Sequence, residues 1–521
     1  GKTVAVQAIN FAPASSPSIA GGKEPVLPRI AIIDIGPSSS GMISLIKEAL
    51  PANRRHEVLF RKLRMSRDDA VNVFDTQLGM REPTANERTF LINFLTLICG
   101  DGTKPPSVAM RGLITACIDR VYEDLKDDKS PRRYMREDER EVDRALDEIG
   151  FDADPETVWW DVVDVLMESG RLYEASIAQR HAVPTIADLV TASQTDQVSS
   201  LYASARDPET DQPIMNAFQR MISEVVRDFP ILSTYTKFSI GSSRIVSLDL
   251  MDVTASGAGP TARRQTAIMY MLARQILTRD FFLDEAEIRS KVNNGVLPSL
   301  YLQHHVDRAR QNLQLPKILC MDEFHRTGQI EMVCDQILQD AREGRKFNVD
   351  IKIASQLIED FPPSIVEIVS SLIVCNAGSE NSISYFDKMF GLSDTEKYVI
   401  RNHLTGPSSR GAPIWGMFRL KDEGTVRQKL ILTLGPAEIW AFSTTAEDVV
   451  LRNRLYEEIG PRMTRQVLAR RFPGGSAKSE IEARIAQMEE QGQRIGENER
   501  GDVLGSLVED LKKQAFLMQD V

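Results

Sequence analysis

The stretch Pro316-Lys-Ile-Leu-Cys-Met-Asp-Glu-Phe-His-Arg326 predicts the centre of the fold. Its residues 318–321 form an unbroken apolar run, which is typical of a strand buried on both faces of a parallel sheet. Asp322 and Glu323 follow directly. Ligands of open α/β sheets bind beyond the carboxyl ends of the strands, so both acids are expected where they can take part in chemistry. A buried strand followed by two solvated acids is the simpler alternative.

The beginning of the chain supplies a second signal of phosphate chemistry. An apolar strand followed by Asp-Glu is the Walker B pattern, in which the Asp supports Mg²⁺ and the Glu polarises the attacking water. The chain opens Gly1-Lys2-Thr3, which is how a Walker A loop ends. In that loop the Lys reaches the β and γ phosphates and the Thr hydroxyl binds Mg²⁺. Since the earlier glycines and an initiator Met are missing, we expect a fragment of a longer protein.

Composition narrows the class of protein. Hydrophobic residues make up 42% of the 521 residues and charged residues 26%, as in ordinary soluble globular proteins of two or three domains. Acidic residues outnumber basic ones by 74 to 63, which argues against a chain-wide nucleic-acid footprint. No apolar run approaches the roughly 18 to 20 residues that cross a bilayer. The five cysteines lack metal-ligand spacing, and they indicate a reducing cytoplasm rather than a zinc site.

Buried strands and helical periods alternate, which predicts an α/β fold with a mostly parallel sheet. Residues 29–34 are expected to form a strand that ends at Asp34, on the same edge of the sheet as Asp322. The Ser/Gly turn after it either contacts a nucleotide or is a plain capped connection into a helix. Other expected extended segments are 57–63, 72–76, 244–248, 349–354 and 372–375, with antiparallel strands at the sheet edge over 413–420 and 428–434.

Four segments are expected along the chain. Residues 1–88 form the first part of the ATPase core, 89–230 an all-α insertion, 231–445 the second part of the core, and 446–521 a helical C-terminal tail. In the tail an apolar stripe fits docking on the body or on a partner; its residues are Leu504, Leu507, Val508 and Leu511.

Three more positions are candidates for contact with the transferred phosphate or the attacking water. Gln356 follows the strand next after Walker B, where a polar side chain can bond the γ-phosphate or the attacking water. Arg345 and Arg410 are two candidates for an arginine acting across a subunit interface, and the sequence does not choose between them. His325 completes Asp-Glu-Phe-His, a helicase-like motif, but no Ser-Ala-Thr motif follows, so a local hydrogen-bonding role is favoured.

These motifs, in this order, resemble the large ATPases of type IV secretion and conjugation. The motifs Gly344-Arg-Lys-Phe-Asn348 and Ala354-Ser-Gln356 add to the Walker elements. The chain looks most similar to the IcmB (DotO) class of Dot/Icm and IncI-type systems, itself related to the VirB4-like and TraC-like ATPases. The resemblance covers residues 1 to about 445.

The resemblance implies a RecA/FtsK-like P-loop core, a hexamer, and hydrolysis of ATP with Mg²⁺ at subunit interfaces. It places the protein in the cytoplasm, peripheral to the inner membrane, with a second secretion ATPase and inner-membrane components of the channel as partners. Gly1, Lys2 and Thr3 would bind the nucleotide, Thr3 and Asp322 the metal; Glu323 would be the base and Gln356 the γ-phosphate sensor. The alternatives are a DNA-translocating ATPase of conjugation, with DNA as partner, and a structural docking subunit that binds nucleotide without turnover.

Overall fold

The computed structural model describes residues 2–15, 26–101, 104–208, 210–257, 259–327, 330–376, 379–408, 410–490 and 497–519. Its centre is a five-stranded sheet in the order β2-β3-β1-β4-β5, in which every neighbouring pair is parallel. The strands are β1 (Arg29–Asp34), β2 (Val58–Lys62), β3 (Ile245–Asp249), β4 (Lys317–Met321) and β5 (Val349–Ile353). The α/β class and the parallel sheet predicted from the sequence are therefore confirmed.

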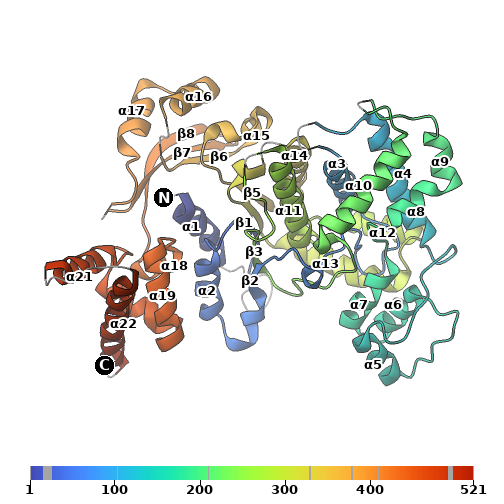
Figure 1. Ribbon diagram of the computed structural model, residues 1–521, viewed down its shortest axis with the longest axis horizontal. Coiled ribbons are helices and arrows are strands. Elements are labelled where there is room, and N and C mark those ends of the chain that lie inside the picture. Colours follow the sequence, from blue (N-terminus) through green and yellow to red (C-terminus); the bar gives the residue numbers. More distant parts are fainter. Residues whose placement is uncertain are drawn as a thin grey trace.

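Alternate residues of the central strands face two different cores. Ile30 and Ile32 of β1 pack with Ile318 and Cys320 of β4 and with residues of α1 (Lys2–Ser15) and α2 (Ser40–Ala49). Ala31, Ile33, Leu319 and Met321 belong instead to the largest core, with α3 (Ala85–Ile98), α11 (Pro260–Thr278) and α14 (Glu331–Gly344). Figure 1 shows these two sets of helices on opposite sides of the sheet. Since both faces are covered, the strands are continuously apolar.

A helical region lies between β2 and β3 in the chain. It begins with α3, whose N-terminus has a capping box between Thr84 and Glu87, and it ends with α10 at Asp228. The helices after α3 are α4 (Val108–Asp124), α5 (Arg140–Ile149), α6 (Trp159–Glu168), α7 (Leu172–Ala182), α8 (Asp188–Gln194), α9 (Asp196–Tyr202) and α10 (Ile214–Asp228). Trp159 and Trp160 are buried, as expected for packing residues, in a core that joins α5 to α7 with apolar residues of the segment 283–309.

Two expectations about strands are wrong. Residues 72–76 form turns rather than a strand, because the Asn72 side chain accepts a hydrogen bond from the Phe74 amide (3.1 Å). The late antiparallel strands do not extend the central sheet; they form a second sheet in the order β6-β7-β8. Its strands are β6 (Ser371–Val374), β7 (Ala412–Leu420) and β8 (Gly424–Leu432), packed against α16 (Glu380–Phe390) and α17 (Asp394–His403).

The C-terminal helices share a further core. Leu507, Val508 and Leu511 of the predicted apolar stripe are buried there beside Trp440, and Leu504 is half-buried. The stripe therefore docks within the chain. The helices are α18 (Pro436–Phe442), α19 (Ala446–Ile459), α20 (Pro461–Arg471), α21 (Lys478–Glu490) and α22 (Glu497–Gln519).

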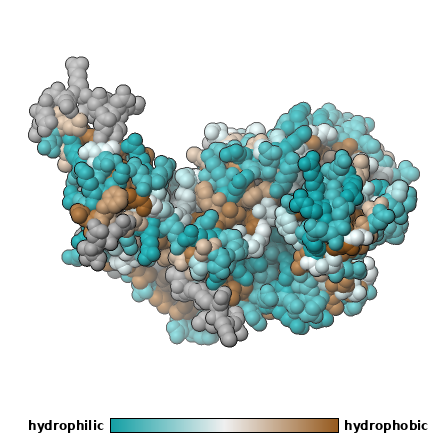
Figure 2. All heavy atoms as spheres, turned by 90° about the horizontal axis from the view of Figure 1, so that it is seen from below, coloured by the Kyte–Doolittle hydropathy of each residue, from teal (hydrophilic) through white to brown (hydrophobic). Residues whose placement is uncertain are grey.

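Hydrophilic residues cover most of the face seen in Figure 2, with smaller apolar patches between them. Across the described part of the chain, no helix is both long and apolar enough to cross a bilayer.

The remaining α-helices are α12 (Glu285–Asn293), α13 (Leu302–Gln314) and α15 (Pro363–Ile368).

Candidate functional site

The two acids after β4 lie at the carboxyl edge of the sheet. The Asp322 amide still donates to the Ile33 carbonyl of β1 (2.9 Å), so Asp322 continues the ladder and its side chain is buried. Glu323 has a positive φ of 54°, which is uncommon for a residue other than glycine. The chain turns sharply there into a 3₁₀ helix over Phe324–Thr327. Backbone outliers of this kind concentrate at functional sites.

Lys2, in the first turn of α1, contacts both acids. Its Nζ lies 2.9 Å from Asp322 Oδ1 and also forms an ion pair with Glu323. Burial works to lower the pKa of Lys2, but the charges of Asp322 and Glu323 outweigh it and the pKa is raised. Burial works to raise the pKa of Glu323, yet Lys2 holds it below its usual value. The N-terminus of α1 is thus directed at the acids that the sequence pairs with it.

The Glu323 carboxylate is also contacted from the segment that follows β5. Gln356 Nε2 donates to Glu323 Oε2 (3.1 Å), and His325 Nε2 lies 3.6 Å from that oxygen. The hydroxyl of Ser355 accepts from the His325 amide (3.2 Å) and donates to Asp360 (2.6 Å). Glu323 is therefore contacted by His325 from its own turn, and by Lys2 and Gln356 from two other segments of the chain.

Two further acids end the neighbouring strands. Asp34 of β1 and Asp249 of β3 are both buried. Asp249 accepts from the amide of Gly36 (2.8 Å), which fixes the turn after β1. Asp34 accepts from the Ser38 hydroxyl and the Ser39 amide; burial, with the charge of Asp322, raises its pKa to about 6 despite these bonds. The turn is thus bonded to Asp34 and Asp249, and the Ser39 hydroxyl bonds that of Ser247 (2.6 Å) rather than capping α2.

One contact to the acids comes from a residue that the sequence does not single out. Tyr270 of α11 is fully buried, and its hydroxyl donates to the backbone carbonyl of Asp322. A tyrosine in the apolar pattern of a helix indicates a core residue. Its contact with the Asp322 carbonyl depends on how the helix packs against the sheet, which the sequence does not show. Asp249 was easier to place, since it directly follows the strand expected over 244–248.

The two arginine candidates lie at different ends of the sheets. Arg345 is exposed at the end of α14, just before β5 begins, and hence at the edge opposite to Glu323. Arg410 precedes β7, which runs antiparallel to β6, so its loop lies beyond the carboxyl end of β6. Cys375 lies at that end; burial raises the pKa of its thiol, and the charge of Lys2 acts against this rise. The Arg410 loop and Cys375 thus lie beyond the same end of β6.

The motif Gly344-Arg-Lys-Phe-Asn348 makes a tight turn. A Cβ on Gly344 would lie 2.9 Å from the Val349 carbonyl, Phe347 is buried, and Asn348 has a φ of 56°. Lys346 forms an ion pair with Asp284. The spacing of the motif therefore suits the connection from α14 into β5.

Two predicted ligands of the nucleotide fall outside what the structure describes. Gly1 is not among the described residues, and Thr3 is described only as part of the α1 backbone. Within the described residues, no three His, Cys, Asp or Glu side chains form a metal-binding group. Mg²⁺ characteristically takes one or two protein carboxylates and completes its shell with phosphate oxygens and water. Asp322 and Glu323 already share a cation, the Lys2 ammonium, so the acids present fit that requirement.

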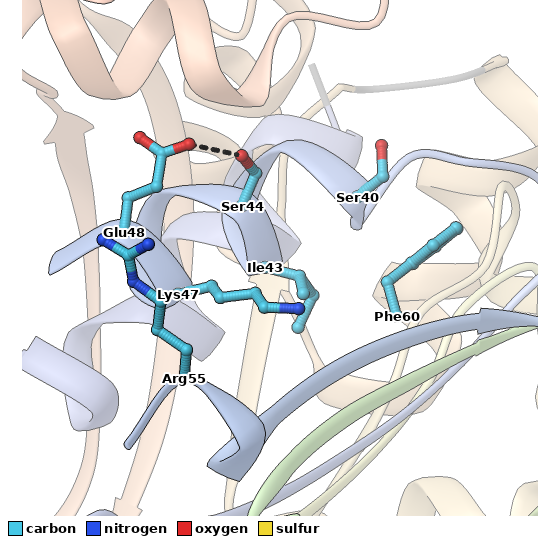
Figure 3. A pocket seen from close by; sticks show the side chains of 7 residues that line it. All are labelled: Ser40, Ile43, Ser44, Lys47, Glu48, Arg55 and Phe60. Atoms are coloured by element: carbon cyan, nitrogen blue, oxygen red, sulfur yellow. Dashed lines mark hydrogen bonds between the residues drawn. The ribbon is translucent and has the colours of Figure 1, made fainter. Parts of the chain in front are cut away.

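A separate cavity of about 360 Å³ lies along α2, and Figure 3 shows the side chains around it. Lys47 and Arg55 border it, and the Glu48 carboxylate accepts from Ser44 (3.3 Å) and pairs with Arg465 of α20. The lining residues are Ser40, Ile43, Ser44, Lys47, Glu48, Arg55 and Phe60. The cavity is therefore distinct from the cluster around Glu323.

Comparison with known proteins finds similarity among solved structures alone. No protein-family model matches the sequence, and no curated protein matches it. Among solved structures, VirB4 of Thermoanaerobacter pseudethanolicus is similar over 84% of this chain and 88% of that one, with a TM-score of 0.48 and 14% sequence identity.

Proposed function

We propose that the protein is the ATP-hydrolysing motor of a bacterial type IV secretion or conjugation system, of the Dot/Icm kind. It would work at the cytoplasmic side of the inner membrane, where it energises assembly or substrate transfer. The observation that supports this most is the convergence of Lys2, Asp322 and Glu323. Lys2 and Asp322 are 320 positions apart in the sequence, yet the Lys2 ammonium contacts the carboxylates of both Asp322 and Glu323.

Each residue of the cluster has a role in this proposal. Lys2 binds the β and γ phosphates, and Asp322 supports Mg²⁺, which neutralises charge on the phosphate oxygens. Glu323 orients the attacking water and accepts its proton. Transfer of Lys2 from the acids to a phosphate would release Glu323 for that task. Gln356, whose amide donates to Glu323 Oε2, would respond to the γ-phosphate through that hydrogen bond.

A working enzyme of this kind would be a homo-oligomer, with a hexamer as the expected form. Arg345 lies at the edge of the sheet opposite to Glu323, so it would reach a nucleotide only in a neighbouring subunit. Arg410 lies in the loop beyond the carboxyl end of β6, a position that is compatible with either subunit. A second secretion ATPase and inner-membrane channel components would be its partners.

The proposal is tested by steady-state ATP hydrolysis with Mg²⁺, with the mass of each sample from size-exclusion chromatography. We expect Glu323→Gln to lower kcat about 100- to 10,000-fold, as removal of a general base does, while ATP binding and the oligomer remain. Glu331→Gln is the matched control, because Glu331 is an exposed carboxylate at the start of α14, outside the Glu323 cluster.

Other outcomes would point to the alternatives. Equal turnover in the wild type and Glu323→Gln would contradict the assignment of Glu323. Binding of ATP without turnover by the wild type would favour a structural docking subunit. A rate raised by added DNA would favour a DNA-translocating ATPase.

A further inference from the structure

We infer that Tyr270 is a positioning residue for hydrolysis: its hydroxyl sets the peptide unit from which the Glu323 side chain projects. This inference rests on the proposed function and extends it to a residue outside the Walker motifs. The contact that supports it is the hydrogen bond from the Tyr270 hydroxyl to the Asp322 carbonyl.

The peptide between Asp322 and Glu323 differs from its neighbours in how it is bonded. The amide before it, that of Asp322, donates to Ile33 of β1 (2.9 Å), and the amide after it, that of Phe324, donates to Ala354 (3.0 Å). The unit between them bonds to side chains instead. Its N–H donates to the Asp322 carboxylate (2.8 Å), and its C=O accepts from Tyr270. The sheet ladder therefore does not fix its rotation.

That rotation decides where Glu323 points. The positive φ of Glu323 is unfavourable for a residue with a side chain, so surrounding contacts must stabilise this backbone conformation. Without Tyr270, the buried carbonyl of Asp322 would lose the partner that it has in this conformation. Rotation of the peptide would then move the Glu323 carboxylate away from Lys2 and Gln356.

Tyr270 is held on a rigid element. Arg274, one turn further along α11, forms a fully buried ion pair with Asp340 of α14. A donor of fixed position is what a positioning residue requires.

The chain offers a closely matched control. Tyr122 of α4 is also buried in the largest core, and its hydroxyl also donates to a backbone carbonyl, that of Phe74 (2.6 Å). Tyr270→Phe and Tyr122→Phe thus remove the same kind of bond from the same core. Any general loss of stability should appear in both variants, whereas an effect on catalysis should appear in Tyr270→Phe alone.

The test is the ATPase activity of the full chain with each variant. We expect Tyr270→Phe to lower kcat roughly 5- to 100-fold, the range of one lost buried hydrogen bond, with KM changed less than about 2-fold. Tyr122→Phe should match the wild type. In single-turnover assays, Tyr270→Phe should add less than about a 2-fold loss to Glu323→Gln, because Tyr270 acts through Glu323.

Three results would count against the inference. Equal kcat in Tyr270→Phe and Tyr122→Phe, or a rise in KM alone, would overturn the positioning role while ATP hydrolysis by the wild type stands. A full multiplicative loss in the double variant would show that Tyr270 does not act through Glu323. A wild type that does not hydrolyse ATP would overturn the proposed function, and the positioning role with it.

Discussion

Two clusters of charged side chains differ in how completely their charges are satisfied. Arg274 and Asp340 have 1% and 0% of their side chains exposed. Arg274 Nε donates to Asp340 (2.9 Å), and Gln336 and Gln275 bond the remaining polar atoms. Lys2 and Glu323, by contrast, keep 24% and 22% of their side chains exposed.

This difference in exposure distinguishes a structural scaffold, the Arg274–Asp340 pair, from a candidate ligand site, the cluster of Lys2 and the two acids. The buried pair has its hydrogen bonds supplied from within the protein, so it has no capacity for a ligand. Lys2 retains contact with solvent, and its one ammonium is shared between two acids. A phosphate could take the place of the acids at Lys2, and a metal ion could take the place of the ammonium at the acids. We therefore expect changes in the buried pair to affect mainly stability, and changes in the exposed cluster mainly nucleotide chemistry.

The largest expected effect on stability comes from breaking the buried pair. Asp340→Leu leaves the Arg274 guanidinium buried without its carboxylate, and we expect it to lower the free energy of unfolding by about 3–5 kcal/mol. Denaturant unfolding of the variant and the wild type measures this.

The double variant Arg274→Leu/Asp340→Leu tests the reason for that loss. Because replacing both partners with apolar groups leaves no unpaired charge, it should be less destabilised than Asp340→Leu alone. A double variant that is destabilised by the sum of both single losses would contradict the description of this pair as a scaffold.

The scaffold was more predictable from sequence than the site. The apolar runs ending at Asp34 and Asp322 predict buried parallel strands, because no polar residue interrupts them. Their register then places both acids at one edge of the sheet. Period and burial do not specify which strands are neighbours, however, so β7 and β8 were expected at the edge of the wrong sheet.

Within the site, motif residues were predictable and residues from the surrounding packing were not. Lys2, Asp322, Glu323 and Gln356 follow patterns with fixed spacing, and the structure brings them into contact. Tyr270 has no such pattern, because its role depends on which turn of α11 packs against the segment that follows β4. Arg345 illustrates the converse: a conspicuous basic motif lies at the opposite edge and takes part in a turn.

A third cluster sharpens the comparison, because its buried group is neutral. His305 is fully buried; its Nε2 bonds the Leu78 carbonyl (2.7 Å), and its Nδ1 faces the Arg308 guanidinium (3.3 Å). Burial, with the charge of Arg308, lowers its pKa to about 3, against opposing effects of the Leu78 carbonyl and Asp280. A second proton would have to point at Arg308.

This cluster predicts a loss of stability in mild acid. Below about pH 6.5 the unfolded chain binds a proton at His305 that the folded chain does not, so stability falls as the pH drops toward 3. At pH 5 the loss is on the order of 2 kcal/mol. In His305→Gln, the difference in unfolding free energy between pH 7 and pH 5 should shrink by that amount. An unchanged difference would show that His305 does not determine this pH dependence.

The smallest expected effect on stability belongs to the functional cluster. Lys2→Met should change the unfolding free energy by less than about 1 kcal/mol, because the pair is partly exposed and water can solvate Glu323. The same variant should lose ATP binding, measured by titration with a fluorescent ATP analogue. A stability loss comparable to that of Asp340→Leu would mean that Lys2 and the two acids belong to the scaffold. Retained ATP binding would remove Lys2 from the proposed phosphate site, since no other described residue of the predicted Walker A end reaches Asp322 and Glu323.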